Sequence, residues 1–410
     1  MTEIAITVSQ LLLLVSIGIA ARLLVNTVPT VPFTIVLLSV GLLIAVLPIH
    51  LGLVLSHDIL FLVFLPPILF AGGLRLNFDR VRQNAPLIVL LLLVGLPIAI
   101  VAMGIGGLYV FSFPLAVSLL LGAMLYPLDP VAVLSVFKEM DAPDRLLAII
   151  EGEPLFDDGI AVVFFSTFLQ LVQSTQTTGH SLAAVLTLGR VATIVVDFIV
   201  TSVGGLLVGV ILGGIAVGLS GYLATDAATD VLLSVGAAYG SMVLAEHYFH
   251  FSGILSVVTA GIVVGVAGEQ GWLTSDGRAF VRSTWDEADL LSNTGVYVLI
   301  GAQTQVAALI EHADLILLAT GLFFAARAGI VYGLTPIANR WLTDPVPMNY
   351  RHILVWGALH TVVPIALALS LPAQLPFSSQ LQTIVFGVAI LSILMQGLSM
   401  PYVLKWTNTT

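Results

Sequence analysis

The sequence predicts an all-α integral membrane fold with about 13 transmembrane helices. Of the 410 residues, 59% are hydrophobic and only 9% are charged, whereas soluble domains carry about 25% charged residues. The mean hydropathy is +1.10. A bilayer span takes about 20 mostly apolar residues, and such runs follow one another almost end to end. A water-soluble fold could not bury this much apolar surface.

The predicted spans are apolar runs separated by short polar connections. In order, they are residues 5–25, 33–49, 55–74, 85–110, 114–137, 146–173, 189–219, 228–249, 252–267, 287–308, 314–338, 352–371 and 380–404. No Lys or Arg precedes the first run, so it lacks the basic start of a cleaved signal peptide and is expected to remain as a span. No soluble domain is expected in residues 1–410, because the longest polar connection, near 268–289, is too short to bury a core.

Lys and Arg predict the orientation, because they concentrate in the cytoplasmic loops of membrane proteins. With the N-terminus outside and the C-terminus in the cytoplasm, only Arg190 falls outside and only Arg327 falls within a span. The cytoplasmic ends then hold Arg22, Arg75, Arg80, Arg82, Lys138, Arg145, Arg278, Arg282, Arg340, Arg351 and Lys405. A wrong number of spans would scatter these charges, so the asymmetry also supports the span count.

Composition excludes several functions. The formal net charge of -10 does not favour nucleic acid, which selects basic surfaces. The chain has no cysteine, so disulfides, thiol redox chemistry and cysteine metal sites are ruled out. No organic cofactor is expected.

Proline interrupts two of the spans, the fifth at LYPLDPVAV and the twelfth at LHTVVPIALAL. Proline removes a backbone donor and clashes with the preceding turn. In hydrocarbon, the freed backbone groups are tolerated only where they face protein or a wet cavity. The breaks occupy corresponding places in a first and a last group of six spans that flank a seventh, which is the pattern of inverted-repeat transporters. Two ordinary proline kinks are the alternative.

Carboxylates cluster in the fifth and sixth spans, where charged groups are costly and usually functional. They are Asp129, Glu151, Glu153, Asp157 and Asp158. Asp129 sits at the first break, whereas Glu151, Asp157 and Asp158 share roughly one helical face with Pro154. Hard monovalent cations such as Na⁺ prefer oxygen ligands, and carboxylates with broken-helix carbonyls supply them. We therefore predict a Na⁺ site at Asp158, Asp157 and Asp129, where a proton and a cation compete. Helix-end carboxylates near an interface are the alternative.

Two pairs of residues complete the predicted constellation. Arg327 would be strongly unfavourable in a span without a partner, and Glu153, off the stripe leading to Asp158, is the best candidate. The favoured role of this pair is a buried tie between helices, with direct ion binding as the alternative. At the second break, His360 beside Thr361 is a candidate pH sensor that lines the site. The other interpretation is a neutral, hydrogen-bonding histidine.

At these residues the sequence resembles the sodium/proton exchanger branch of the monovalent cation:proton antiporter superfamily, over nearly its whole length. The matching blocks are FLPPILF (64–70), DPVAVLSVF (129–137), GEPLFDDGIAVVFF (152–165), SGILSVVTAGIVVG (252–265), RAGIVYGLTPIANR (327–340), WGALHTVVPIALALSLP (356–372) and FGVAILSILMQGLSMP (386–401). Many motifs in the family's order make the resemblance specific.

The resemblance implies a secondary antiporter, not an enzyme, that exchanges Na⁺, or also Li⁺, for H⁺ across the cell membrane by alternating access and serves pH homeostasis. A dimer-forming scaffold (about 1–80 and 225–310) and a mobile core (about 85–175 and 313–405) are expected, with a linker helix at about 189–219. The resemblance makes Asp158 the essential carboxylate, Asp129 a second acid, and Glu153 with Arg327 a stabilising pair. Its expected partners are Na⁺ (or Li⁺ or K⁺), H⁺, the lipid bilayer and a second copy of the chain.

The chain departs from the family pattern at the site. Asp157 stands where the family usually has Asn, and His360 where many relatives have Arg. Possible oxygen ligands are replaced at Leu128, Pro154 and Ala71, where the family usually has Thr, Ser and Glu. The paired aspartates resemble the other branch of the superfamily, whose members can exchange two protons per sodium. These departures leave ion identity and stoichiometry open, so a K⁺/H⁺ antiporter is an alternative.

Other membrane functions fit less well. An intramembrane aspartyl protease would need Tyr-Asp, Gly-x-Gly-Asp and Pro-Ala-Leu elements, which do not occur here. A zinc protease would need His-Glu-x-x-His; the nearest group is Glu246, His247 and His250, for which a lipid-interface position is favoured. A passive cation channel fits the composition, but it would show uncoupled flux.

Overall fold

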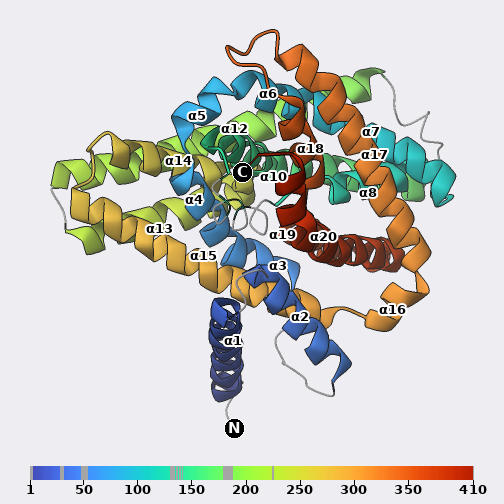
Figure 1. The fold of residues 1–410 in the computed structure, drawn as a ribbon, viewed down its shortest axis with the longest axis horizontal. Helices are drawn as coiled ribbons and strands as arrows, with labels where there is room; N and C mark the ends of the chain where they lie inside the picture. Colours follow the sequence, from blue (N-terminus) through green and yellow to red (C-terminus); the bar gives the residue numbers. More distant parts are fainter. Residues whose placement is uncertain are drawn as a thin grey trace.

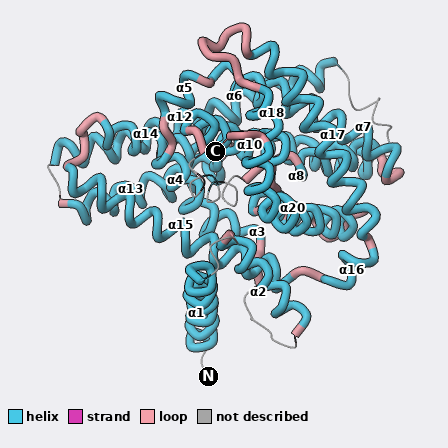
Figure 2. The backbone as a smooth tube through the Cα atoms, viewed as in Figure 1, coloured by secondary structure: helices cyan, strands magenta, loops and turns pink. Residues whose placement is uncertain are grey.

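The computed structural model describes residues 3–27, 32–47, 54–129, 134, 137, 140, 142–178, 188–223 and 226–409. Within these residues all regular structure is helical, as Figures 1 and 2 show. The predicted all-α class is therefore confirmed. Residues 130–133, in the second half of the predicted first break, lie outside the described part of the chain.

The helices of the first half are α1 (Glu3–Thr27), α2 (Phe33–Val46), α3 (His57–Ile59), η1 (Leu60–Phe64), α4 (Leu65–Arg75), α5 (Phe78–Gln83), α6 (Ala85–Leu90), η2 (Leu91–Gly95), α7 (Leu96–Val110), α8 (Leu115–Leu125) and α10 (Asp144–Thr178). Those of the second half are α12 (Leu188–Leu223), α13 (Ala227–Val243), η3 (Leu244–Tyr248), α14 (Gly253–Glu269), α15 (Ser275–Gln303), α16 (Val306–Glu311), α17 (Ala313–Ala338), α18 (Met348–Trp356), α19 (Val362–Leu369) and α20 (Ser378–Trp406). The segments labelled η are wide π-helical turns that join their neighbours into longer helices.

Every predicted span contains helix in the described residues. Among these residues, 7 helical segments are long and apolar enough to cross a bilayer. Shorter apolar helices fall in the first, second, fifth and ninth predicted spans, and α15 and α18–α19 fall in the tenth and twelfth. A single chain with this series of apolar helices is a multi-pass membrane protein.

The helix of the tenth predicted span begins well before the predicted apolar run. The run is predicted at 287–308, whereas α15 begins at Ser275 and ends at Gln303. The helix starts early because the Thr274 hydroxyl accepts a hydrogen bond from the Gly277 amide at 3.0 Å and Asp276 lies in the first turn. Capping and a favourable charge at the N-terminus stabilise helix in a sequence too polar to be read as a span.

The helices form two lobes that meet around α10 (Figure 1). In the lobe on the left of Figure 1, α14 packs against α12, α13 and α4, and α15 packs against α13, α4 and α2. In the lobe on the right, α7 packs against α8 and α17, and α20 against α17 and α19. Because α10 contacts both α8 and α14, its residues can face either lobe.

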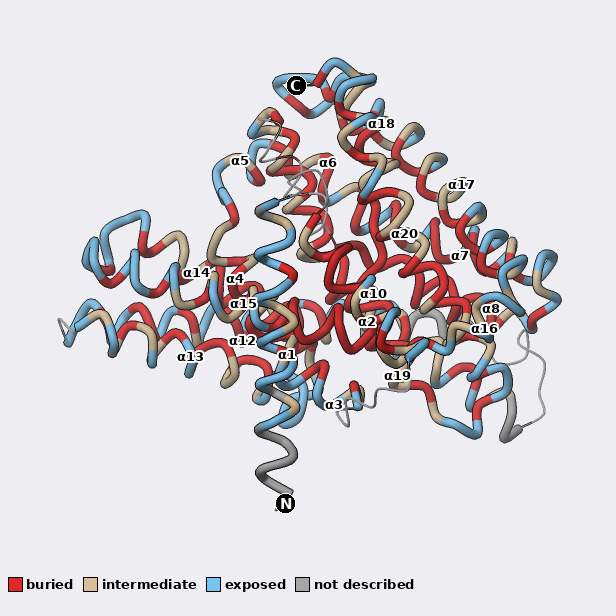
Figure 3. Tube along the Cα trace, turned by 60° about the horizontal axis from the view of Figure 1, so that its bottom comes forward, coloured by how far each residue is buried: buried red, intermediate tan, exposed pale blue. Residues whose placement is uncertain are grey.

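Burial follows this arrangement. Buried positions concentrate where the lobes meet, whereas the outer faces of α1, α12 and α13 are largely exposed (Figure 3). The exposed face of α12 carries large apolar side chains such as Ile199, Leu207 and Ile211. A continuous apolar face of this kind is unfavourable in water and suits contact with lipid.

Glycines allow the helices of the left lobe to approach closely. A Cβ atom on Gly73 of α4 would lie 2.4 Å from the Val258 carbonyl oxygen of α14, and one on Gly261 of α14 would lie 2.5 Å from the Phe70 carbonyl oxygen. Larger residues at either position would force the backbones apart. This contact fixes α4, which forms one wall of the site described next.

Candidate functional site

The described part of each predicted break is not helical. After α8 ends at Leu125, Tyr126–Asp129 are not helical, and Gly357–Thr361 separate α18 from α19. The two unwound segments meet, because the Asp129 amide donates a hydrogen bond to the Leu359 carbonyl oxygen at 2.9 Å. The freed backbone groups of one break are thus partly satisfied by the other, as hydrocarbon requires.

Asp129 lies at this crossing and receives hydroxyl donors from two directions. Thr361 donates to its Oδ2 atom from the second break, and Tyr297 of α15 donates to the same oxygen at 3.4 Å. Asp129 is only 9% exposed and Tyr297 is fully buried. The sequence predicted Asp129 and Thr361 for the site but did not predict Tyr297.

Asp129 and Asp158 line one cavity of about 90 Å³ between α4, α10 and the start of α19. Glu151, Pro154 and Arg75 line it as well, while Leu65, Ile68 and Val362 supply apolar walls. Within the described part of the chain, the Oδ1 atom of Asp158 is buried without a hydrogen-bond partner. A carboxylate with an unsatisfied oxygen beside a small cavity can accept a proton or a cation.

Asp157 does not line this cavity. It is fully buried and interacts electrostatically with Glu153 and Arg327, whereas Asp158 interacts with Asp157 and Asp129. Neither Asp157 oxygen has a hydrogen bond of normal geometry in the described residues, although the Leu128 amide is near enough to interact. Of the three predicted carboxylates, Asp158 and Asp129 thus line the cavity, whereas Asp157 lies beside Asp158 outside its lining.

The structure joins Arg327 of α17 to Glu153 of α10 in a bidentate ion pair. Arg327 Nη2 donates to Glu153 Oε2 at 2.8 Å, and Nη1 donates to Oε1. The same guanidinium donates to the Tyr126 hydroxyl and to the Leu354 carbonyl oxygen, each at 3.3 Å. Arg327 and Glu153 are each 2% exposed. One side chain therefore links α10, α17, α18 and the first break.

His360 lies away from the cavity. It is 1% exposed and packs edge-on against Phe323, with ring centroids 4.0 Å apart. Its backbone amide donates to Ser392 Oγ of α20 at 3.1 Å. Gln396, also on α20, donates to the Ala358 carbonyl oxygen at 3.0 Å. These contacts brace the second break from α20, and sequence reasoning did not find Ser392 or Gln396.

The structure also reveals a charged cluster at the edge of the cavity. Arg75 donates to Asp286 at 2.6 Å and to Asp289 at 2.8 Å. Asn293 donates to the other carboxylate oxygen of Asp289 at 2.6 Å. The sequence alone does not single out Asp289, because it lies at the end of the long polar connection near 268–289.

Polar side chains also line cavities outside this site, including two beside α12 and α16. One, of about 270 Å³ between α10, α12 and η3, is lined in part by Asp197, Glu246 and His250. Glu246 accepts a hydrogen bond from the Gly253 amide at 2.9 Å, so it caps α14. Among the described residues no group of three or more His, Cys, Asp or Glu could hold a metal ion. The zinc alternative at Glu246, His247 and His250 therefore has no structural support.

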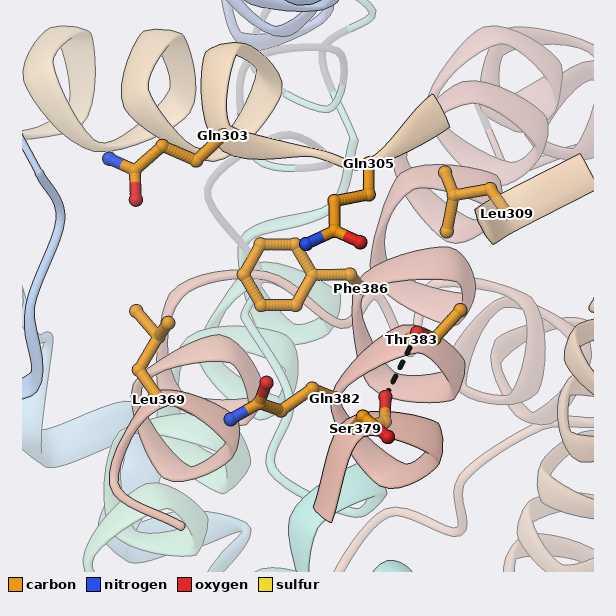
Figure 4. A pocket seen from close by; sticks show the side chains of 8 residues that line it. All are labelled: Gln303, Gln305, Leu309, Leu369, Ser379, Gln382, Thr383 and Phe386. Atoms are coloured by element: carbon orange, nitrogen blue, oxygen red, sulfur yellow. Dashed lines mark hydrogen bonds between the residues drawn. The ribbon is translucent and has the colours of Figure 1, made fainter. Parts of the chain in front are cut away.

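The other cavity, of about 200 Å³, lies beside α16 where α15, α19 and α20 approach one another (Figure 4). Gln303, Gln305 and Gln382 carry amides into this region, and Gln382 donates to the Ala368 carbonyl oxygen at 3.1 Å. Its lining residues are all uncharged. A cation site is better served by the acids of the first cavity.

Comparisons with known proteins agree with this geometry. The family model described as the transmembrane part of the sodium/hydrogen exchanger matches residues 11–406. The Na(+)/H(+) antiporter ApNhaP of Aphanothece halophytica is 31% identical over 406 residues, which is 96% of this chain and 73% of the relative. NhaP of Pseudomonas aeruginosa, also a Na(+)/H(+) antiporter, is 33% identical over 358 residues, covering 83% and 79%.

The fold is also found in a solved antiporter structure. The sodium proton antiporter MjNhaP1 from Methanocaldococcus jannaschii, at pH 8, matches with a TM-score of 0.72 and 20% identity, covering 99% of this chain and 97% of that chain. At this identity the match establishes the architecture and leaves the chemistry to the residues of the site.

Proposed function

Because this chain belongs to the sodium/hydrogen exchanger family, we propose that it is a secondary antiporter that exchanges Na⁺ for H⁺. The family membership confirms the resemblance read from the sequence. The observation that carries the proposal is the pair Asp158 and Asp129, which line one small cavity where two broken helices cross. Buried carboxylate oxygens at such a crossing suit small hard cations.

In the proposed mechanism, Asp158 is the essential carboxylate and Asp129 the second acid. A carboxylate can hold either a proton or a cation, so binding of one displaces the other. Asp157 is proposed to add a second titratable group next to Asp158 without lining the cavity. It influences the site through the shared electrostatic environment of Asp158, Glu153 and Arg327.

The Arg327–Glu153 pair is proposed to hold the core together during the transport cycle. The two buried side chains neutralise each other's charge, so neither is expected to bind the transported ion. Breaking a buried pair leaves an uncompensated charge. Its link to Tyr126 places this brace directly behind the first break.

Transport is proposed to follow alternating access. The helices within 85–175 and 313–405 form the mobile core, 1–80 and 225–310 form the scaffold of a homodimer, and 189–219 links them. The two lobes that meet at α10 support this division. Arg80 pairs with Asp144, while Arg145 donates to the Asp344 carbonyl oxygen and Arg351 to that of Val346. This grouping of three arginines favours a cytoplasmic C-terminus and an external N-terminus in the plasma membrane.

The test is proton flux in proteoliposomes that contain the purified full chain, with Na⁺, Li⁺ or K⁺ supplied in turn. Na⁺ should dissipate an imposed pH gradient across pH 6–9, and Li⁺ should replace it because both are small hard cations. Activity with K⁺ alone would overturn the substrate assignment. Flux without a coupled counter-ion would instead indicate a passive channel, and no cation-dependent flux would reject transport by this site.

A further inference from the structure

A polar stripe on α15 faces the candidate ion site. Asp289, Asn293 and Tyr297 follow one another at four-residue steps, so they lie on one face of the helix. Their exposures are 8%, 4% and 0%, respectively. Polar groups buried at membrane depth are costly and usually functional. Asp289 and Asn293 hydrogen-bond to each other, and the last member, Tyr297, reaches Asp129.

Packing alone does not require a hydroxyl group at Tyr297. A phenylalanine would fill the same space, whereas a buried hydroxyl must be hydrogen-bonded to offset its lost hydration. Its acceptor is Asp129 Oδ2, at 3.4 Å. Thr361 donates to that same oxygen from the second break. One carboxylate oxygen is therefore held by hydroxyls from two different elements.

We propose that Tyr297 is a positioning residue of the ion site, which holds the Asp129 carboxylate in the orientation that faces the cavity shared with Asp158. The inference deepens the proposed antiport function and rests on it. The site lacks three polar side chains that the family resemblance implies, at Leu128, Pro154 and Ala71. Tyr297 supplies a hydroxyl group to the site from α15.

Tyr297 therefore joins the two lobes at the site. Its helix packs against α2, α4 and α13, whereas Asp129 follows α8. If the lobes are scaffold and core, the hydroxyl contacts the carboxylate only when the core occupies the position seen in this structure. Asp129 is also near the charges of Asp158 and Asp289, so its orientation affects both of these acids.

The test is Tyr297→Phe in the full chain, measured as Na⁺-driven proton exchange in proteoliposomes. Phenylalanine keeps the ring and removes only the hydroxyl. Loss of one hydrogen bond worth about 1 kcal/mol weakens binding about fivefold. The KM for Na⁺ should therefore rise about three- to tenfold, while Vmax stays within about twofold. A purely structural role would leave the KM unchanged.

Tyr239→Phe is the matched control. Tyr239 lies on α13, and its hydroxyl donates to the Val63 carbonyl oxygen at the same length of 3.4 Å, outside the site. This variant should keep the wild-type KM. An unchanged KM in Tyr297→Phe, with exchange by the wild type intact, would overturn the inference. Absence of exchange by the wild type would instead overturn the proposed function.

A second measurement does not depend on transport. The thermal midpoints of wild type, Tyr297→Phe, Asp129→Ala and the double variant, in detergent, form a double-mutant cycle; alanine removes the acceptor, whereas asparagine would keep an amide oxygen. Because the hydroxyl acts through Asp129, Tyr297→Phe should lower the midpoint less in the Asp129→Ala background. Additive changes would contradict a direct Tyr297–Asp129 interaction, even if one variant were poorly active.

Discussion

Two faces of α10 carry buried carboxylates that differ in how completely they are paired. On one face, Glu153 is fully engaged by Arg327, and both side chains are 2% exposed. On the other face, Asp158 keeps an oxygen without a hydrogen-bond partner in the described residues and borders a cavity. A buried charge that is completely paired makes each partner depend on the other, whereas an incompletely paired charge beside a cavity is available to a ligand. Four substitutions test this distinction.

The largest expected effect on transport is that of Asp158→Asn. Asparagine keeps the shape of the side chain but cannot be ionised, so exchange should be abolished while folded yield stays normal. Proteoliposome flux and size-exclusion chromatography check the two expectations. Asp197→Asn, another substitution within a span but at a different cavity, should keep exchange. Transport by Asp158→Asn would remove the central assignment.

Arg327→Ala should damage the fold more than the apparent ion affinity. It leaves Glu153 buried without its partner, at a cost of about 3–5 kcal/mol. Folded yield and the thermal midpoint in detergent should fall sharply, while any remaining protein keeps the wild-type cation preference. A well-folded variant with an altered preference would show that this pair takes part in ion binding after all.

Asp157→Asn should have an intermediate effect. The change restores the residue usual in the family and leaves the cavity lining intact, so exchange should persist. If Asp157 carries a second proton, wild-type exchange responds to membrane potential, and the variant should respond less. Proton flux measured with and without a clamped membrane potential tests this expectation. The same potential dependence in both proteins would make Asp157 a structural acid only.

His360→Gln should have the smallest effect. The histidine is buried against Phe323 and lies outside the cavity, and glutamine can keep a neutral hydrogen bond. The pH profile of exchange should therefore stay at its wild-type position. A displaced profile in this variant, measured between pH 6 and 9, would instead support the pH-sensing role that a histidine at a break can have.

The sequence predicted the parts of this site that follow from the energetic cost of placing a proline or a charged side chain within one membrane span. Proline in an apolar run indicated both breaks, and the isolated Arg327 required a buried acid such as Glu153. Those inferences need only the energetics of hydrocarbon. The fold class followed from the same reasoning, since apolar runs of spanning length leave few other structures.

The parts it could not predict depend on how separate helices face one another. Tyr297 has no mark in the sequence that distinguishes it from a membrane-interface tyrosine, because its partner Asp129 is 168 positions away. The ion pairs of Arg75 with Asp286 and Asp289 depend equally on the packing of α4 against α15. The different surroundings of Asp157 and Asp158 depend on the same packing, because α4 and α19 close the cavity over Asp158 and not over Asp157.

The hydrogen bond from the Asp129 amide to the Leu359 carbonyl oxygen consists of main-chain atoms only. Almost any side chain at either position keeps it; a proline in place of Asp129 would abolish the donor. The crossing can therefore accept new side chains around it, as Leu128 and His360 illustrate, and still keep its geometry. Ion selectivity can then change through the side chains around the crossing, while the main-chain hydrogen bond keeps the two segments in place.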